Sequence, residues 1–176
     1  ISAGVALIQP VHGRMNVLKG VDQSILIDDT YNSSPAAADA ALRTLYSVQS
    51  PQRIAILGDM NELGEVSAVE HEKLGEFCDP DLLAWVITVG EQSEKYLAPK
   101  ARARGCQVKS FRSAIEAGAF ANSVIEQGSV VLAKGSQGGI YLEEALKILL
   151  RVTSEDQELV RQSPAWMATK NAFFSK

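Results

Sequence analysis

The sequence predicts an α/β fold in which a mainly parallel sheet carries helices on both faces. Short apolar runs rich in β-branched residues, typical of strands buried on both faces, alternate with segments whose apolar residues recur at helical spacing. The connections between them are short, and such alternating units build a parallel sheet between two helical layers. We therefore expect one three-layer domain.

The expected elements follow one another along the chain. The helix over residues 35–49 is the clearest, because Ala38, Ala41, Leu42 and Leu45 fall on one stripe. The expected strands are residues 25–27, 53–57, 85–89, 107–111 and 130–133. The further helices are expected at about residues 67–78, 92–103, 113–124 and 142–149.

Helix starts are predicted from capping boxes, in which a serine and a glutamate three residues later satisfy each other's backbone N–H groups. The pairs are Ser67 with Glu70 and Ser113 with Glu116. At the carboxyl end, the polar composition of residues 153–162 predicts a mobile connector. A Ser-Pro pair after it predicts a short last helix.

The composition argues against several classes of protein. The chain has 176 residues, a net charge of −4 and a pI near 5.2, so it offers no basic field for nucleic acid. It has no apolar run near the roughly 20 residues that cross a bilayer and no positive region of a signal peptide, which favours a cytoplasmic protein without membrane insertion. Cys78 and Cys106 lack metal-ligand spacing and are expected to be buried free thiols.

Three polar loops, at residues 28–34, 58–64 and 134–139, follow strands of the predicted sheet. Ligands of open α/β sheets bind beyond the carboxyl ends of the strands, so we expect these loops to form one site. Two of the residues suit a nucleotide: a ribose diol can donate two hydrogen bonds to Asp29, and the planar guanidinium of Arg14 can bind a phosphate.

For polar residues of the second and third loops, a ligand-binding role and a purely structural role are both open. Lys134 with Ser136 can hold a carboxylate or phosphate, but Lys134 can equally be a surface lysine at a strand end. Asp59 and Glu62 can attract an ammonium group, or they can close the turn and cap a helix, which is slightly favoured. Asp28 and Asp29 are open to the same reading as turn and capping residues.

Two nucleotide-binding signatures are absent from the sequence. Lys134 precedes Gly135 and Ser136, which reverses the order of a P-loop, and no Gly-x-Gly-x-x-Gly fingerprint occurs. The chain alone is therefore expected to hold ATP poorly. His71 is expected to pack against the second loop rather than transfer protons, and we assign no catalytic residue and no metal ligand within this chain.

Several motifs together resemble the carboxy-terminal domain of the Mur ligases. In order they are Gly-Arg at 13–14, Asp-Asp-Thr-Tyr-Asn-Ser-Ser-Pro at 28–35, Gly-Asp-Met-Asn-Glu-Leu-Gly at 58–64, His71, and Lys-Gly-Ser at 134–136. The resemblance covers about residues 11–151 and is closest to the members that add D-alanyl-D-alanine. The chain departs from the family pattern at Ser34, where Asn is common, and at Gln137, where Arg is common.

The resemblance implies a Rossmann-like fold and a part in ATP-dependent amide-bond formation. In that reaction ATP, with Mg²⁺, phosphorylates a carboxylate, and an amine then attacks the acyl phosphate. Arg14 is expected to contact the ATP phosphates and Asp29 the ribose, while Tyr31 and Asn32 belong to the nucleotide-facing loop.

On the amine side, the resemblance implies that Lys134, Ser136 and Asp59 face the incoming substrate, D-alanyl-D-alanine. The second substrate is a UDP-linked muramoyl peptide. The central and amino-terminal domains of the same enzyme are the expected partners, and they supply the metal ligands and the P-loop. Without them this domain is expected to be inactive.

The resemblance also predicts how the chain is divided. Residues 1–12 are expected to be the tail of a missing central ATPase domain and a linker, so the chain is expected to be a piece of a longer protein. Residues 13–152 are expected to be the ligase domain, and residues 153–176 the connector and last helix. Two alternatives stay open: a related ligase domain for another amino acid, and a standalone Rossmann-like binding module.

Overall fold

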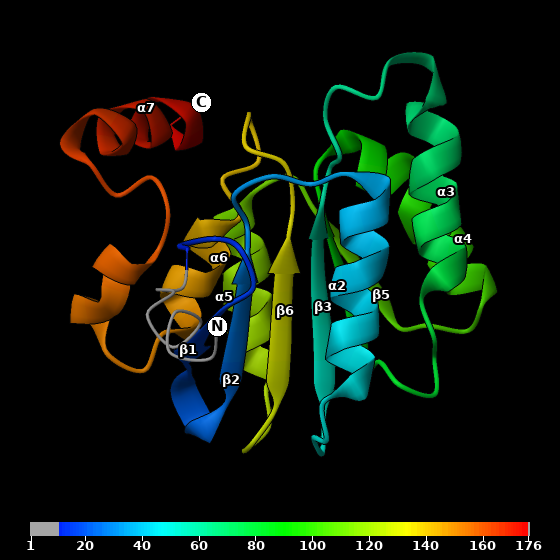
Figure 1. Cartoon of the computed structure of the whole chain (residues 1–176), viewed down its shortest axis with the longest axis horizontal. Coiled ribbons are helices and arrows are strands. Elements are labelled where there is room, and N and C mark those ends of the chain that lie inside the picture. Colours follow the sequence, from blue (N-terminus) through cyan, green and yellow to red (C-terminus); the bar gives the residue numbers. More distant parts are fainter. Residues whose placement is uncertain (1–10, 176) are drawn as a thin grey trace, which may run out of the picture.

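The computed structural model describes residues 11–175, which contain one six-stranded sheet in the order β1-β2-β6-β3-β4-β5 (Figure 1). The strands are β1 (Asn16–Lys19), β2 (Ile25–Asp29), β3 (Arg53–Gly58), β4 (Trp85–Val89), β5 (Val108–Phe111) and β6 (Val130–Lys134). β1 runs antiparallel to β2, and the other neighbouring pairs are parallel. The predicted fold class is therefore confirmed.

Helices cover both faces of the sheet, as predicted. One face carries α2 (Pro35–Ser47), α3 (Ser67–Phe77) and α4 (Ala98–Ala103), and the other carries α5 (Ala114–Val124) and α6 (Glu143–Leu149). The last helix, α7 (Pro164–Phe174), lies level with the loops that follow the strands (Figure 1). Residues 11–175 also contain four short helical turns: η1 (Val21–Gln23), η2 (Gly64–Val66), the π-helical η3 (Ser93–Leu97) and η4 (Thr153–Glu158).

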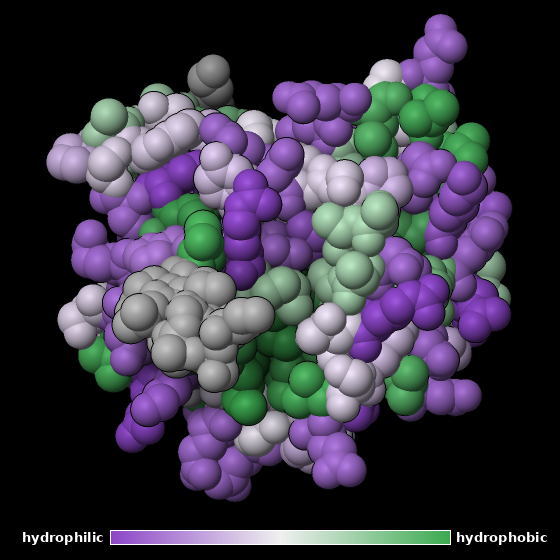
Figure 2. Space-filling view, viewed as in Figure 1, coloured by the Kyte–Doolittle hydropathy of each residue, from purple (hydrophilic) through white to green (hydrophobic). Residues whose placement is uncertain are grey.

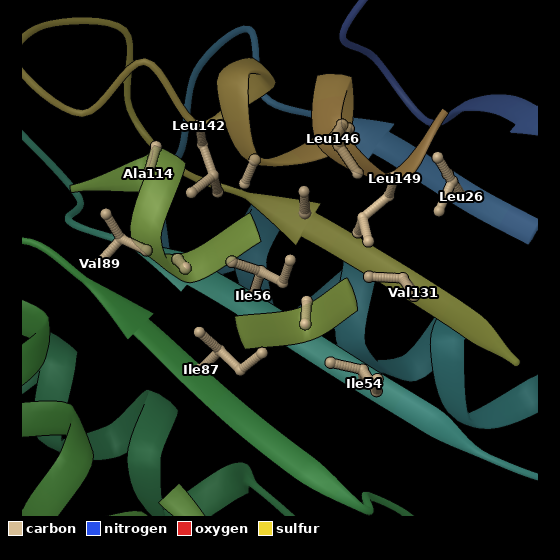
Figure 3. Close-up of a cluster of buried hydrophobic side chains, with 14 of the residues drawn as sticks. Leu26, Ile54, Ile56, Ile87, Val89, Ala114, Val131, Leu142, Leu146 and Leu149 are labelled. Carbon is tan, nitrogen blue, oxygen red and sulfur yellow. The ribbon is translucent and has the colours of Figure 1, made fainter. Parts of the chain in front are cut away.

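Two apolar clusters hold these layers together. Behind the sheet, Leu146 and Leu149 of α6 lie near Leu26 of β2 and Val131 of β6 (Figure 3). In front, the stripe predicted for α2 is fully buried and packs against β2, β3 and β6. Full burial of one such leucine contributes about 1.5–3 kcal/mol, so the sheet that positions the polar loops is well supported.

The predicted capping boxes do not form. Ser67 is the first helical residue of α3, and its hydroxyl lies 3.4 Å from Nδ1 of His71. Ser113 is the N-cap of α5 but makes no side-chain capping bond, and Glu70 pairs with Lys73 instead. The Ser-x-x-Glu spacing indicates where these helices begin, but it does not fix the rotamers that a reciprocal pair of bonds needs.

The segment after α6 packs more closely than its polar composition predicts. Leu159 and Val160 are buried, and the side chain of Arg161 is only 4% exposed. Ser163 caps α7 as expected, and Phe174 packs against the cluster behind the sheet. Residues 159–161 therefore belong to the packed body, which corrects the expectation of a loose connector there. The tail expected at residues 1–10 lies outside the described residues.

Cys78 and Cys106 are buried free thiols, as expected. Over residues 11–175, no helix combines the length and the apolar character needed to cross a membrane.

Candidate functional site

The parallel register of β2 and β6 brings Asp29 and Lys134 together at the carboxyl ends of the strands. The two residues are paired across the sheet, and Nζ of Lys134 lies 2.9 Å from Oδ2 of Asp29. The loop after β3 joins them, because the backbone N–H of Ser136 donates to the carbonyl oxygen of Asp59 at 2.9 Å. The three loops thus share one edge of the sheet, as the sequence predicted.

A cavity of about 420 Å³ opens between the first loop and α2. Arg14, Asp29, Asn32 and Lys134 contribute its polar wall, and small residues of α2 form much of the opposite side. Its volume lies in the range of small-molecule sites. In Figure 2, hydrophilic side chains gather over the carboxyl ends of β2 and β6. The predicted nucleotide residues Arg14, Asp29 and Asn32 therefore line one cavity.

Arg14 and Tyr31 lie together at the rim of the site. The guanidinium carbon of Arg14 is 4.4 Å from the centroid of the Tyr31 ring, which is cation–π distance. The residue Tyr31 is 41% exposed, and its backbone N–H donates to the carbonyl oxygen of Gly13 at 2.9 Å. The exposed guanidinium keeps its N–H donors available for an anion.

Lys134 is not a surface residue. It is 2% exposed, and Nζ donates to the carbonyl oxygen of Asn32 at 2.7 Å as well as to Asp29. The carbonyl oxygen of Asp29 is a third acceptor at 3.5 Å. The three ammonium hydrogens thus have protein acceptors, so Lys134 lies with the predicted nucleotide residues and organises their loop.

A second cavity, of about 280 Å³, lies between the three loops. Ser136 lines it together with Asn32, Asn61 and Glu62. The hydroxyl of Ser136 accepts a hydrogen bond from the backbone N–H of Asn61 at 2.8 Å and donates to the carbonyl oxygen of Ser33 at 3.4 Å. Ser136 therefore ties the loops together and forms part of a small polar cavity separate from the cavity next to α2.

Asp59 caps a helix instead of facing either cavity. Its carboxylate accepts hydrogen bonds from the backbone N–H groups of Gln92 at 3.1 Å and Ser93 at 2.7 Å. Gly90 leaves room for it, because a Cβ there would lie 2.5 Å from the carboxylate. Of the two roles weighed for Asp59, these contacts favour capping, and the capped helix follows β4 rather than β3.

His71 is a packing residue in this structure. It is fully buried, and Nε2 accepts a hydrogen bond from the backbone N–H of Met60 at 3.0 Å. Nδ1 lies 2.8 Å from the carbonyl oxygen of Ser67, so the hydrogen-bond network assigns the proton to Nδ1. Both ring nitrogens are engaged, which agrees with the predicted packing against the second loop.

Asp28 supports the first loop from inside the molecule. Its Oδ1 accepts hydrogen bonds from the backbone N–H and the hydroxyl of Thr30, at 3.1 and 2.6 Å. Its Oδ2 is buried and has no hydrogen-bond partner among residues 11–175. Burial raises the pKa of Asp28 above its ordinary value of 3.8, and the hydrogen bonds from Thr30 oppose this shift.

Sequence reasoning missed two residues that contact this loop or its support. Arg161 donates to the carbonyl oxygen of Thr30, and Glu143 is a fully buried partner of Arg161. Their sequence context gave no motif. The only signal was an arginine placed directly after two apolar residues in a polar segment.

Comparison with known proteins finds similarity over the part of the chain that contains the first two loops and most of the third. A model of the family described as "Mur ligase, glutamate ligase domain" matches residues 13–137. The UDP-N-acetylmuramoyl-tripeptide--D-alanyl-D-alanine ligase of Escherichia coli (strain K12) is 33% identical over 93 residues, which are 53% of this chain and 20% of that protein. The Bacillus subtilis (strain 168) protein of the same name is 28% identical over 145 residues, 78% of this chain and 30% of that protein.

Solved structures agree with the family model. The MurF ligase from Thermotoga maritima in complex with ADP superposes with a TM-score of 0.68 and 26% identity, over 90% of this chain and 34% of that one. A crystal structure of MurF from Acinetobacter baumannii gives 0.68 and 28%, over 82% and 32%. The chain spans less than a third of the length of each of the two curated relatives described above. The chain belongs to the Mur ligase family, and it corresponds to the carboxy-terminal domain of that family.

Proposed function

We propose that this chain is the third domain of an ATP-dependent ligase that joins D-alanyl-D-alanine to a UDP-linked muramoyl peptide. The observation that carries the proposal is the cavity beside α2, whose polar wall combines Arg14, Asp29 and Asn32. The names of the relatives support the substrates, because those proteins are D-alanyl-D-alanine ligases of a UDP-linked tripeptide. The domain would cover the nucleotide and position the amine.

On the nucleotide side, the chemistry of each residue suits one part of ATP. Each carboxylate oxygen of Asp29 already accepts one hydrogen bond, from Met15 and from Lys134, and keeps a lone pair for a ribose hydroxyl. Arg14 can form a bidentate contact with a phosphate. The Tyr31 ring supports that guanidinium, and Asn32 contributes a polar edge.

On the amine side, the second cavity suits a small zwitterion. Asn61 keeps one amide hydrogen for a carboxylate beside its bond to Gly138, and the hydroxyl of Ser136 can turn from its long 3.4 Å bond with Ser33 to donate to the same group. Glu62 offers a carboxylate for an ammonium group. Lys134 was expected here, but its bonds to Asp29 and Asn32 favour a role in holding the first loop. Asp59 has a structural role in this proposal, as the cap of the helix after β4.

The remaining parts of the reaction belong to the rest of the enzyme in this proposal. The described residues contain no cluster of three His, Cys, Asp or Glu side chains that could hold a metal ion. By resemblance to the family, the central domain supplies the P-loop and the Mg²⁺ ligands, and the amino-terminal domain binds the uridine nucleotide. The enzyme would act in the cytoplasm.

The test is an assay of the full-length protein. Phosphate release from ATP is measured with the UDP-linked muramoyl tripeptide and, in parallel, with D-alanyl-D-alanine or with single amino acids as the amine. Turnover with the dipeptide and not with the amino acids is expected. Preference for one amino acid would assign the domain to a related ligase instead. The 176-residue chain assayed alone is expected to give no ATP turnover.

A further inference from the structure

The segment 159–161 lies outside the residues matched by the family model, yet it contacts the first loop of the candidate site. Arg161 carries this contact. Nη2 donates to the carbonyl oxygen of Thr30 at 2.7 Å, and Nη1 donates to that of Tyr31 at 3.3 Å. The acceptors in these bonds are backbone carbonyls, which a substitution leaves in place, so the bonds can be removed by mutating Arg161.

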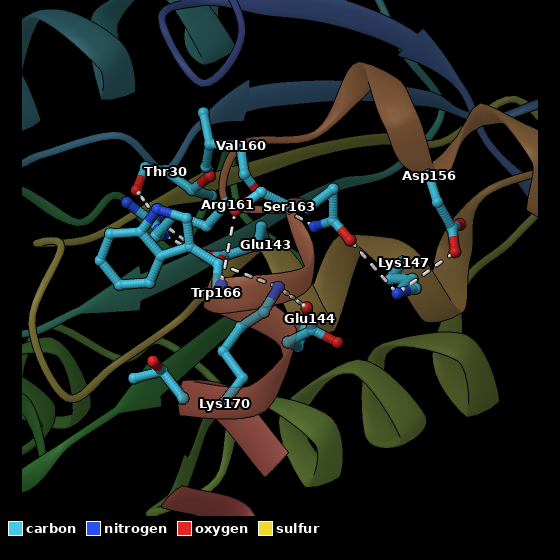
Figure 4. A network of polar contacts seen from close by, with 12 residues as sticks. Thr30, Glu143, Glu144, Lys147, Asp156, Val160, Arg161, Ser163, Trp166 and Lys170 are labelled. Atoms are coloured by element: carbon cyan, nitrogen blue, oxygen red, sulfur yellow. Dashed lines mark hydrogen bonds and ion pairs between the residues drawn. The ribbon is translucent and has the colours of Figure 1, made fainter. Parts of the chain in front are cut away.

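Arg161 is itself held by a buried carboxylate (Figure 4). Nε and Nη2 bond the two carboxylate oxygens of Glu143 at 2.8 and 2.7 Å, in the bidentate geometry that fixes a guanidinium plane. Lys170 of α7 adds a second cation to the same group, through Glu143 at 3.5 Å and through Glu144. The arginine therefore has one fixed orientation relative to α6.

Thr30 is fixed from two sides as a result. Asp28 accepts from its N–H and hydroxyl, while Arg161 binds its carbonyl oxygen. Asp29 precedes Thr30 and Tyr31 follows it, so the clamp acts on the backbone between two proposed nucleotide residues. A loop held in this way loses less conformational entropy when a ligand binds, so binding is stronger.

The same segment also packs against Gly13, the residue before Arg14. A Cβ at Gly13 would lie 2.6 Å from Cγ1 of Val160 and 2.9 Å from the backbone nitrogen of Tyr31. Gly13 has a φ of +69°, in the left-handed region that favours glycine. Val160 thus packs next to the residue before Arg14, and Arg161 holds the loop that follows Asp29.

We propose that Arg161 is a positioning residue for nucleotide binding, and that segment 159–161 acts as a brace for the loop from Asp28 to Asn32. The inference rests on the proposed function, because it assigns a consequence for ATP. It predicts that loss of the guanidinium weakens ATP use while the chemical step and the amine site stay intact.

The experiment measures KM and kcat of the full-length ligase with Arg161→Gln, Arg161→Lys and Lys170→Met. Lys170 is the matched control, because it is equally buried in the same charge cluster and does not contact the loop. For Arg161→Gln we expect KM for ATP to rise about tenfold, because the unbraced loop must then be ordered when ATP binds, with kcat and KM for the dipeptide within about twofold. Arg161→Lys is expected to keep part of the affinity, and it serves alone if Arg161→Gln does not fold.

The control variants separate the possible failures. Lys170→Met is expected to lower Tm as Arg161→Gln does while KM for ATP stays within about twofold. An equal rise of KM in Lys170→Met, or an unchanged KM in both Arg161 variants, would overturn the brace. Asp29→Ala in the same enzyme tests the site itself. If it raises KM for ATP while the Arg161 variants do not, the proposed function stands and only the brace fails, whereas an unchanged KM in Asp29→Ala removes the nucleotide assignment of this loop and the brace with it.

Discussion

Lys134 forms a buried ion pair with Asp29 across two neighbouring strands, although 105 residues separate the two in the chain. The side chain of Lys134 is 2% exposed and that of Asp29 is 13% exposed. An ion pair at this depth has lost most of its hydration, so each partner depends on the other. The pair also fixes the side chain that we assign to the ribose.

Breaking this pair is expected to destabilise the domain strongly. Lys134→Met leaves the Asp29 carboxylate without its cation, and removing one partner of a buried pair costs about 3–5 kcal/mol. Urea unfolding of the chain measures this free energy. The matched control is Lys73→Met, which removes a lysine that is 63% exposed from its pair with Glu70 and is expected to cost less than about 1 kcal/mol.

A double-mutant cycle then separates the pair from general damage. Asp29→Asn combined with Lys134→Met removes both charges, so the combined loss is expected to be smaller than the sum of the two single losses. Strict additivity would show that the two side chains do not stabilise each other.

Asp29 is also expected to determine the affinity for ATP. In the full-length ligase, Asp29→Ala removes the acceptor proposed for the ribose hydroxyls and is expected to raise KM for ATP about tenfold or more, since hydrogen bonds to charged groups contribute about 1.5–3 kcal/mol. Steady-state kinetics with varied ATP measure the change. Asp39→Ala is the control, because it removes an exposed acid whose partner is Arg43 on α2. No difference between the two variants would remove the ribose assignment.

The sequence was sufficient for the five parallel strands, for the helices that cover them and for the shared edge of the loops, but it did not predict the antiparallel strand β1. The stripe at Ala38, Ala41, Leu42 and Leu45 is a local pattern, and its burial follows from helical geometry alone. Parallel strands bring their exit loops to one edge whatever the strand order, so the common site was predictable too.

The partners of each polar residue were not predictable, because they depend on which strands are neighbours. β6 lies between β2 and β3, which pairs Lys134 with Asp29 and buries it. Asp59 caps the helix after β4 because β3 lies next to β4. Arg161 contacts Thr30 across 131 residues of sequence. Local spacing contains no information on contacts of this range.

Asp59 is expected to matter for stability and not for substrate affinity. Asp59→Ala removes the acceptor for the N–H groups of Gln92 and Ser93, and loss of such a cap costs about 0.5–2 kcal/mol. Urea unfolding of the chain measures the loss, and KM for D-alanyl-D-alanine in the full-length ligase is expected to stay unchanged. A raised KM for the dipeptide without a loss of stability would return Asp59 to the amine site.

Asp28 is expected to make the stability of the domain depend on pH. Burial raises the pKa of Asp28 in the folded chain, so the folded state binds this proton more tightly than the unfolded state does. The favourable contribution of the protonated carboxyl is complete below the unfolded pKa of 3.8 and is lost as the pH rises through the raised folded pKa. Above that pH the domain carries an ionised carboxylate whose Oδ2 is buried without a partner.

Asp28→Asn removes this ionisation and keeps an oxygen that can accept from Thr30, at the position where Oδ1 now does so. The amide nitrogen replaces the unpartnered Oδ2, and a neutral buried group costs less than a charged one. The variant is therefore expected to be more stable than the parent chain at neutral pH, and the difference should shrink as the pH is lowered toward about 4. Urea unfolding of both chains across this range measures the difference, with Asp39→Asn as the exposed control. A difference that is independent of pH would mean that Asp28 ionises alike in the folded and unfolded chain.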